Sequence, residues 1–276
     1  MDNTIQHLGE IKGKILVFGG VYSNFQALEE LAYLAKKEDI PAERIFCTGD
    51  IVGYCASPVE CLEFIQKWGI HAIQGNVEEN LVNGTEDCGC NFSEGSRCDV
   101  FAKQWFAFAT LKMTPMTLAY MENLPKRITF SYAGKNVHLF HGSDANISEF
   151  IFGSTPWEIK KANFISTKAD VILAGHCGLP FADVKENLFW LNPGVIGMPA
   201  NDGTPRVWYM LLDDTSGSFS YQFKSYEYDS GEANQLMLEN GLPFSYADTL
   251  LTGIWDNSDI LPEFETSQQG ISLNLE

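Results

Sequence analysis

The sequence predicts an α/β fold, because short apolar runs alternate with segments that show helical spacing and helix-capping residues. Four of the apolar runs are followed by a polar signature: Gly49-Asp50, Gly75-Asn76, His141-Gly142-Ser143 and Gly175-His176. The chain has 276 residues, of which 45% are hydrophobic and 20% charged. These values are typical of a globular chain that can form one large domain.

The first predicted unit is a strand, a tight turn and a helix. Ile15 to Phe18 forms an apolar run, Gly19-Gly20 makes the turn, and the helix is expected from about Asn24 to Lys37. Ser23 and Gln26 have the spacing of a capping box. Free amides at such a helix start could also bind phosphate without a metal, although a lone Gly-Gly turn is weak support for that.

The second unit follows the same order. Ile45 to Cys47 is expected to be a buried strand, and Ser57 and Pro58 predict a helix start that Glu60 would complete as a capping box. Gly69 predicts the helix end, and the apolar run His71 to Ile73 then predicts another strand.

A polar loop comes next, between Asn83 and Asp99, and it carries Cys88, Cys90 and Cys98. A zinc knuckle would need a fourth soft ligand and the usual C-x2-C spacing, so it is the less favoured interpretation. The following aromatic helix is predicted from Val100 to about Leu111.

The remaining predicted elements are strands and an acidic end. Strands are expected at Val137 to Phe140 and Val171 to Ala174, and a late hairpin at Arg206 to Leu212 and Ser218 to Phe223. We expect a single domain over residues 1–262, with an acidic accessory part from about residue 225 and a mobile tail at 263–276.

Charge limits the possible partners. The chain has 18 Lys and Arg against 36 Asp and Glu, a formal net charge of -18, and no basic cluster. Long nucleic acids and anionic membranes are therefore excluded as expected partners. Met1 to Lys14 lacks the pattern of a signal peptide, so we expect a cytoplasmic location and seven reduced cysteines.

The four polar signatures together predict a metal site. A buried strand that ends in such a residue delivers its side chain to the rim of a sheet, where open α/β folds bind ligands. Asp50, Asn76, His141 and His176 form a mixed oxygen and nitrogen set suited to one divalent ion such as Mn, Fe or Zn. Each histidine alone would more often be structural, so the prediction depends on their convergence.

The same blocks resemble the calcineurin-like metallophosphoesterases, especially their compact bacterial branch. The ordered segments that carry this resemblance are Gly20-Val21-Tyr22-Ser23-Asn24, Gly49 to Tyr54, Gly75 to Glu78, His141-Gly142-Ser143 and Gly175 to Phe181. The resemblance implies a sandwich of two mixed β-sheets flanked by helices, and a metal-dependent phosphoester hydrolase that acts on a small phosphorylated substrate.

The resemblance also implies a departure from the family pattern. Members hold two ions, and the ligands of the first ion fall here on Gly20, Tyr22 and Gly178, which are poor donors. The ligands of the second ion all remain, so we expect one ion and no second. Val77 stands at the position of a histidine that many members use, and Glu78 keeps an acidic position without a catalytic role.

Two functions follow from this pattern. The first is a one-metal phosphatase or phosphodiesterase with impaired or altered activity, whose catalytic residues the sequence does not identify. The second is an inactive relative that binds a nucleotide, another phosphorylated ligand or a protein partner. Tyr22 and Asn24 are candidate substrate contacts, with space filling for Tyr22 and helix capping for Asn24 as the structural alternatives.

Overall fold

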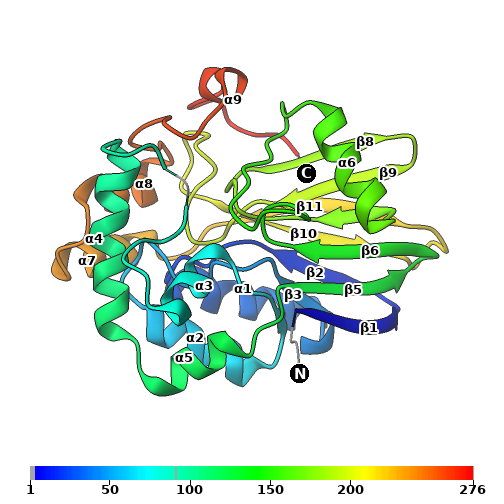
Figure 1. Cartoon of the computed structure of the whole chain (residues 1–276), viewed down its shortest axis with the longest axis horizontal. Coiled ribbons are helices and arrows are strands. Elements are labelled where there is room, and N and C mark those ends of the chain that lie inside the picture. The colour runs from blue at the N-terminus through cyan, green and yellow to red at the C-terminus, as the bar shows by residue number, and fades with distance from the viewer. Residues whose placement is uncertain (1–3, 91, 276) are drawn as a thin grey trace.

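The computed structural model describes residues 4–90 and 92–275, which form two mixed β-sheets packed face to face (Figure 1). The larger sheet has the strand order β1 (Ile5–Ile11), β5 (Arg127–Tyr132), β6 (Lys135–Phe140), β7 (Val171–Leu173), β9 (Leu188–Pro193) and β8 (Pro180–Lys185). The smaller sheet has the order β11 (Ser220–Tyr226), β10 (Val207–Asp213), β2 (Ile15–Phe18), β3 (Ile45–Cys47) and β4 (His71–Ala72). The predicted α/β sandwich of two mixed sheets is confirmed.

Helices lie outside both sheets. They are α1 (Phe25–Lys37), α2 (Pro58–Trp68), α3 (Asn76–Asn83), α4 (Arg97–Lys112), α5 (Pro115–Glu122), α6 (Trp157–Thr167), α7 (Ser230–Glu239), α8 (Phe244–Thr252), α9 (Glu263–Ser267) and the short 3-10 helix η1 (Ala42–Arg44). In Figure 1 most of them gather beside the smaller sheet, whereas α6 lies against the larger one.

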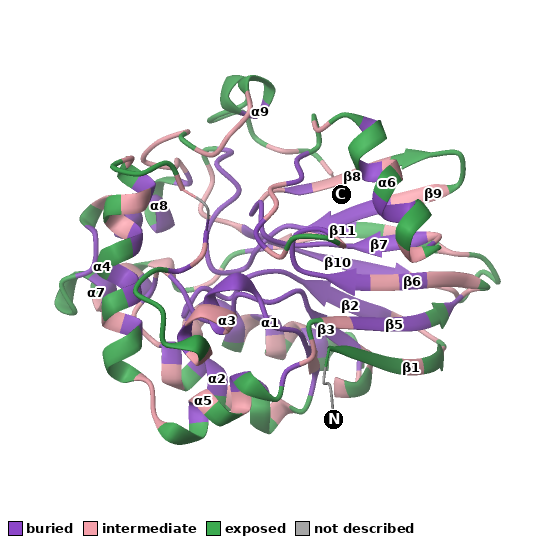
Figure 2. Ribbon diagram, in the orientation of Figure 1, coloured by how far each residue is buried: buried purple, intermediate pink, exposed green. Residues whose placement is uncertain are grey.

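The alternation of side chains along β2 shows why the strands are apolar throughout. Ile15 and Val17 point into the core between the sheets, and Leu16 and Phe18 point toward the helices. Because successive strand residues face opposite sides, a strand covered on both faces needs apolar residues at every position. Figure 2 shows the buried centre of the sandwich and the exposed strand β1 at its edge.

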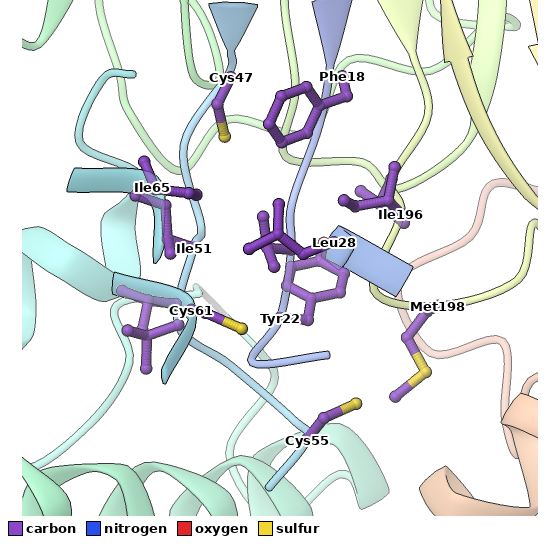
Figure 3. Packing of buried hydrophobic residues seen from close by; sticks show 14 of the residues in the cluster. Phe18, Tyr22, Leu28, Cys47, Ile51, Cys55, Cys61, Ile65, Ile196 and Met198 are labelled. Atoms are coloured by element: carbon purple, nitrogen blue, oxygen red, sulfur yellow. The ribbon is translucent and has the colours of Figure 1, made fainter. Parts of the chain in front are cut away.

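Three apolar clusters fill the layers. The first joins the smaller sheet to helices that include α1 and α2, the second fills the space between the sheets, and the third joins β7 and β9 to α6 through Trp157 and Phe164. Figure 3 shows part of the first cluster, which includes Tyr22, Leu28, Ile196 and Met198. Within the described part of the chain, no helix combines the length and apolar character needed to cross a membrane.

The predicted helix starts need two corrections. Asn24 caps α1 by accepting a hydrogen bond from Ala27 N at 3.2 Å, whereas Ser23 Oγ accepts one from Gly53 N at 3.1 Å. Ser57 precedes α2 but makes no side-chain cap, so its predicted capping box does not form. Serine side chains can bond to several nearby backbone groups, so the tertiary fold decides whether a serine caps the helix that follows it.

Other predicted boundaries agree with the structure. Gly69 ends α2 in the left-handed conformation, and β10 pairs with β11 as an antiparallel hairpin within the smaller sheet. Helix α4 begins at Arg97, three residues earlier than predicted, because Ser96 caps it by accepting from Asp99 N.

The prediction of seven reduced cysteines is wrong for two of them. Cys88 and Cys90 form a disulfide, while Cys47, Cys55, Cys61, Cys98 and Cys177 are buried free thiols. Gly89 has a φ of +66° between the pair, and the resulting turn brings the two Cα atoms to 5.4 Å, within the usual range for a disulfide.

The segment predicted to be a mobile tail makes specific contacts in the structure. Helix α9 lies in it, and the carboxylate of Glu265 accepts hydrogen bonds from Ser154 N and Ser154 Oγ at 2.9 and 2.6 Å. Further along, Gly270 N donates to Asn201 O, and Arg206 donates to Ser272 and Leu273.

Candidate metal centre

The four predicted ligands meet where the two sheets come together. Asp50 follows β3 and Asn76 begins α3 after β4, so the smaller sheet supplies both oxygen ligands. His141 follows β6 and His176 follows β7, so the larger sheet supplies both nitrogen ligands. Because β3 is parallel to β4, and β6 to β7, each pair of strands ends at one edge of its sheet.

The ligand atoms of these residues converge around one imidazole nitrogen. His141 Nε2 lies 3.0 Å from Asn76 Oδ1, 3.1 Å from Asp50 Oδ2 and 3.1 Å from His176 Nδ1. All four residues are buried. Asp50, His141 and His176 also form the one group of metal-binding residue types found in residues 4–90 and 92–275.

The hydrogen bonds around the cluster set the state of its atoms. The carbonyl of Thr48 lies 2.7 Å from His141 Nδ1, so it is the acceptor for a proton on that nitrogen and directs the Nε2 lone pair toward the cluster. Asn76 Nδ2 donates to Cys88 O at 2.8 Å, so Oδ1 faces His141. His141 Nε2 is thus surrounded by oxygen and nitrogen atoms that accept hydrogen bonds. Their lone pairs repel one another unless a proton or a cation lies between them.

Charge interactions within the cluster shift three pKa values. Burial opposes ionisation of Asp50, but the neighbouring histidines outweigh it and lower the pKa of that carboxyl. Burial likewise opposes protonation of His141, but Asp50 raises the pKa of this imidazole. Burial and the adjacent His141 lower the pKa of His176 to about 3. Asp50 and His141 therefore each favour the charged form of the other, whereas His176 favours its neutral form.

The residues fit a divalent cation. A neutral imidazole, a carboxylate and an amide oxygen are ligands that such ions accept, and Thr48 supplies the outer hydrogen bond typical of a ligating histidine. His176 turns its Nδ1 toward the cluster, 3.1 Å from His141 Nε2. A cation held by the four side chains would take the place of the proton on His141.

Glu78 holds the loop that presents Asp50. Its Oε2 accepts hydrogen bonds from Asp50 N at 2.9 Å and Gly75 N at 2.8 Å, and its Oε1 accepts one from Val52 N at 2.9 Å. Burial, followed by repulsion from Asp50, raises the pKa of Glu78 to about 7. These bonds hold Asp50 at a φ of +54°, in the left-handed region that few non-glycine residues adopt.

The close approach of Gly75 to Asp50 explains one of the glycine signatures. A Cβ atom at Gly75 would lie 2.1 Å from Asp50 Oδ1, which no side chain can tolerate. The Gly-Asn signature therefore brings two ligand loops into contact, in addition to supplying Asn76.

The two predicted substrate contacts lie in different surroundings. Tyr22 lines a cavity together with Asp50 and His176, and its ring fills the space beside Gly20, where a Cβ would lie 2.5 Å from the ring. Asn24 does not line this cavity. Its amide donates to Gly197 O and Tyr228 OH, and its oxygen caps α1, so the structure shows the capping role and a substrate contact stays a prediction.

Sequence reasoning missed the residues that close the cavity. Phe150 stacks on His176 at 4.2 Å between ring centroids, and Trp255 contributes to the wall from the segment interpreted as an acidic accessory part. A tryptophan inside a polar, acidic stretch was the available signal, because such a side chain usually packs against something.

Comparisons with known proteins agree with this geometry. The model of the calcineurin-like phosphoesterase superfamily domain matches residues 14–217. The uncharacterized protein MJ0912 of Methanocaldococcus jannaschii is 27% identical over 260 residues, which cover 88% of this chain and 99% of that protein.

Two solved structures share the fold. The hypothetical protein PH1004 from Pyrococcus horikoshii OT3 gives a TM-score of 0.73 at 19% identity, over 88% of this chain and 99% of the other. A metallophosphoesterase from Sphaerobacter thermophilus gives 0.67 at 24% identity, over 88% and 100%.

Proposed function

Because this chain belongs to the calcineurin-like phosphoesterase superfamily, we propose that it is a phosphoester hydrolase that works with one divalent metal ion. The observation that carries the proposal is the convergence of Asp50, Asn76, His141 and His176 around His141 Nε2. When bound there, the ion would act as a Lewis acid toward a phosphoryl oxygen.

The site is proposed to lack a second ion. The positions of the other family ligands are Gly20, Tyr22 and Gly178, and the Tyr22 ring fills the space that a side chain at Gly20 would need. A Cβ at Gly178 would lie 3.3 Å from the Trp255 ring, and the φ of +79° at this glycine disfavours any other residue. These contacts support a site with altered chemistry rather than an incompletely loaded two-ion site.

Other residues of the chain would support such a reaction by holding the candidate ligands in place. Glu78 fixes the Asp50 loop, Thr48 orients His141, and Phe150 covers one face of His176. The buried ligands and the apolar wall exclude water from one side of the cluster. Electrostatic interactions between the ligands and a bound charge are stronger where water is excluded.

A second candidate is a relative that has lost turnover and binds a phosphorylated ligand or a protein partner. The filling of the other ligand positions by Tyr22 and Trp255 favours it, because loss of one ion removes several kcal/mol of transition-state stabilisation, on the order of a thousandfold in rate.

The test is hydrolysis of a nitrophenyl phosphodiester and a nitrophenyl phosphomonoester with added Mn, by the parent chain and by Asp50→Ala. We expect slow turnover that disappears in Asp50→Ala. Glu29→Ala is the control, because it removes an exposed carboxylate on α1. Turnover that persists in Asp50→Ala would refute the proposed site, and absence of turnover in the parent chain would favour the binding role.

A further inference from the structure

We propose that the cavity beside the metal cluster selects singly phosphorylated compounds whose organic part is flat and apolar, such as esters of aromatic alcohols. The place of the phosphate in this inference rests on the proposed function, whereas the recognition of the organic part rests on the cavity alone. The phosphate would be the one charged group of such a substrate.

The cavity is contiguous with the metal cluster. Asp50 and His176 form part of its wall, and the cavity is partly open to solvent. A ligand whose phosphate reached the cluster would therefore place its organic part in this cavity.

The wall of the cavity is aromatic and its rings are held in place. Aromatic side chains come from five separated parts of the chain: Tyr22, Tyr54, Phe92, Phe150, and Tyr246 with Trp255. Tyr54 packs edge-on against Tyr246 at 5.1 Å, and Trp255 Nε1 donates to Pro199 O at 2.8 Å. Rings fixed in this way present preformed faces to a flat ligand, so little ordering is needed on binding.

Charge in the cavity argues against a second phosphate. Among the described residues that line it there is no lysine or arginine, and two of them are the carboxylates Asp50 and Asp256. Arg97 lies nearby, but its Nε and Nη2 both donate to Asp256 at 2.6 Å, so its charge is already paired. A di- or polyphosphate would find no cation outside the cluster, in a chain with a net charge of -18.

Two polar side chains of the wall already have hydrogen-bond partners within the protein. Thr249 Oγ1 is bonded to the carbonyl oxygens of Ser245 and Ile254, and Asn257 Oδ1 accepts from Cys98 Sγ and Asp259 N. A ligand with many hydroxyl groups would lose its water without gaining these two side chains as partners, which costs binding energy. This favours an apolar organic part over a sugar.

The experiment compares the binding of 1-naphthyl phosphate and ethyl phosphate to the Mn-loaded protein by calorimetry. We expect the naphthyl ester to bind at least about tenfold more tightly, which is the gain typical of stacking on fixed aromatic rings. Trp255→Ala and Phe92→Ala should each reduce this ratio severalfold. Phe244→Ala is the matched control, because Phe244 is an exposed aromatic residue on α8 that does not line the cavity.

The binding of 1-naphthol to metal-free Asp50→Ala protein separates this inference from the proposed function. Binding that is weakened by Trp255→Ala supports the cavity even if no ester is ever hydrolysed. Equal affinity for the two esters in the parent chain, or a ratio that both wall variants leave unchanged, would overturn the inference. Tighter binding of pyrophosphate than of naphthyl phosphate would also overturn it.

Discussion

At the candidate metal centre, the side chain of Tyr22 limits which residue position 20 can carry. The ring of Tyr22 lies where a side chain at Gly20 would have to be, so the two positions are sterically coupled. A carboxylate at position 20 therefore requires a smaller residue at position 22.

This coupling can be tested with three variants. Gly20→Asp alone should lower the melting temperature, because its Cβ would meet the buried Tyr22 ring at 2.5 Å. Tyr22→His combined with Gly20→Asp should recover much of that loss, although Tyr22→His alone leaves a cavity. A thermal unfolding series in which the double variant is no more stable than Gly20→Asp would contradict the steric account.

Glu78 is predicted to be a positioning residue. Glu78→Gln keeps the size of the side chain but turns an amide toward at least one of the three backbone N–H groups that Glu78 accepts, so we expect a loss of about 1 to 3 kcal/mol of stability. Because the same bonds hold Asp50, Mn affinity should fall by about ten- to a hundredfold, the usual effect of losing an outer-shell partner.

The matched control for that measurement is Glu79→Gln. Glu79 is the neighbouring residue on α3 and pairs with Lys126 on the surface, where ion pairs contribute little. Mn titration that finds the same affinity in Glu78→Gln as in the parent chain would show that Glu78 does not position Asp50.

At the scale of elements, the packing between the sheets fixes the distance between the two pairs of ligands. Phe46 of β3 and Phe130 of β5 stack at 4.9 Å within the intersheet core. Phe130→Ala should therefore cost about 3 to 5 kcal/mol in urea unfolding. Phe264→Ala, an exposed residue on α9, should change stability by less than about 0.5 kcal/mol. Similar losses in both variants would contradict the layered core.

The elements that could be predicted from the sequence are those with strong local patterns. The strand Ile15–Phe18 and the helix Pro58–Trp68 carry apolar runs, capping residues or a terminal glycine. Strand β1 was missed because it is mostly exposed at the sheet edge, so its sequence shows no apolar alternation. Helix α3 was missed because eight residues rich in asparagine and glutamate give little helical signal.

The convergence of the candidate ligands could be predicted because four strand ends carried matching residues, and Asp50, Asn76, His141 and His176 do lie together. The aromatic wall could not be predicted in this way. Phe150 and Trp255 reach the site through contacts between segments that are separated in the sequence, for which no local pattern exists.

At the scale of the whole molecule, the C-terminal segment joins the outer parts of the chain to the site. Residues 254–260 contribute Trp255, Asp256 and Asn257 to the cavity, and α9 follows directly after them. The buried carboxylate of Glu265 then fixes α9 to Ser154.

A chain that ends at Pro262 should therefore be less stable than the full chain, by roughly 1 to 3 kcal/mol for the lost hydrogen bonds to charged groups. Thermal unfolding of the two chains measures this. An unchanged melting temperature would instead support the prediction from the sequence that residues 263–276 are a mobile tail that does not stabilise the fold.

The central claim is that Asp50, Asn76, His141 and His176 hold a single divalent ion. Equilibrium dialysis against Mn, followed by elemental analysis, measures this most directly in the parent chain and in Asp50→Ala. We predict one ion per parent chain and a loss of nearly all bound metal in the variant, because the only carboxylate among the four ligands is removed. Two ions per parent chain, or the same metal content in Asp50→Ala, would contradict the claim.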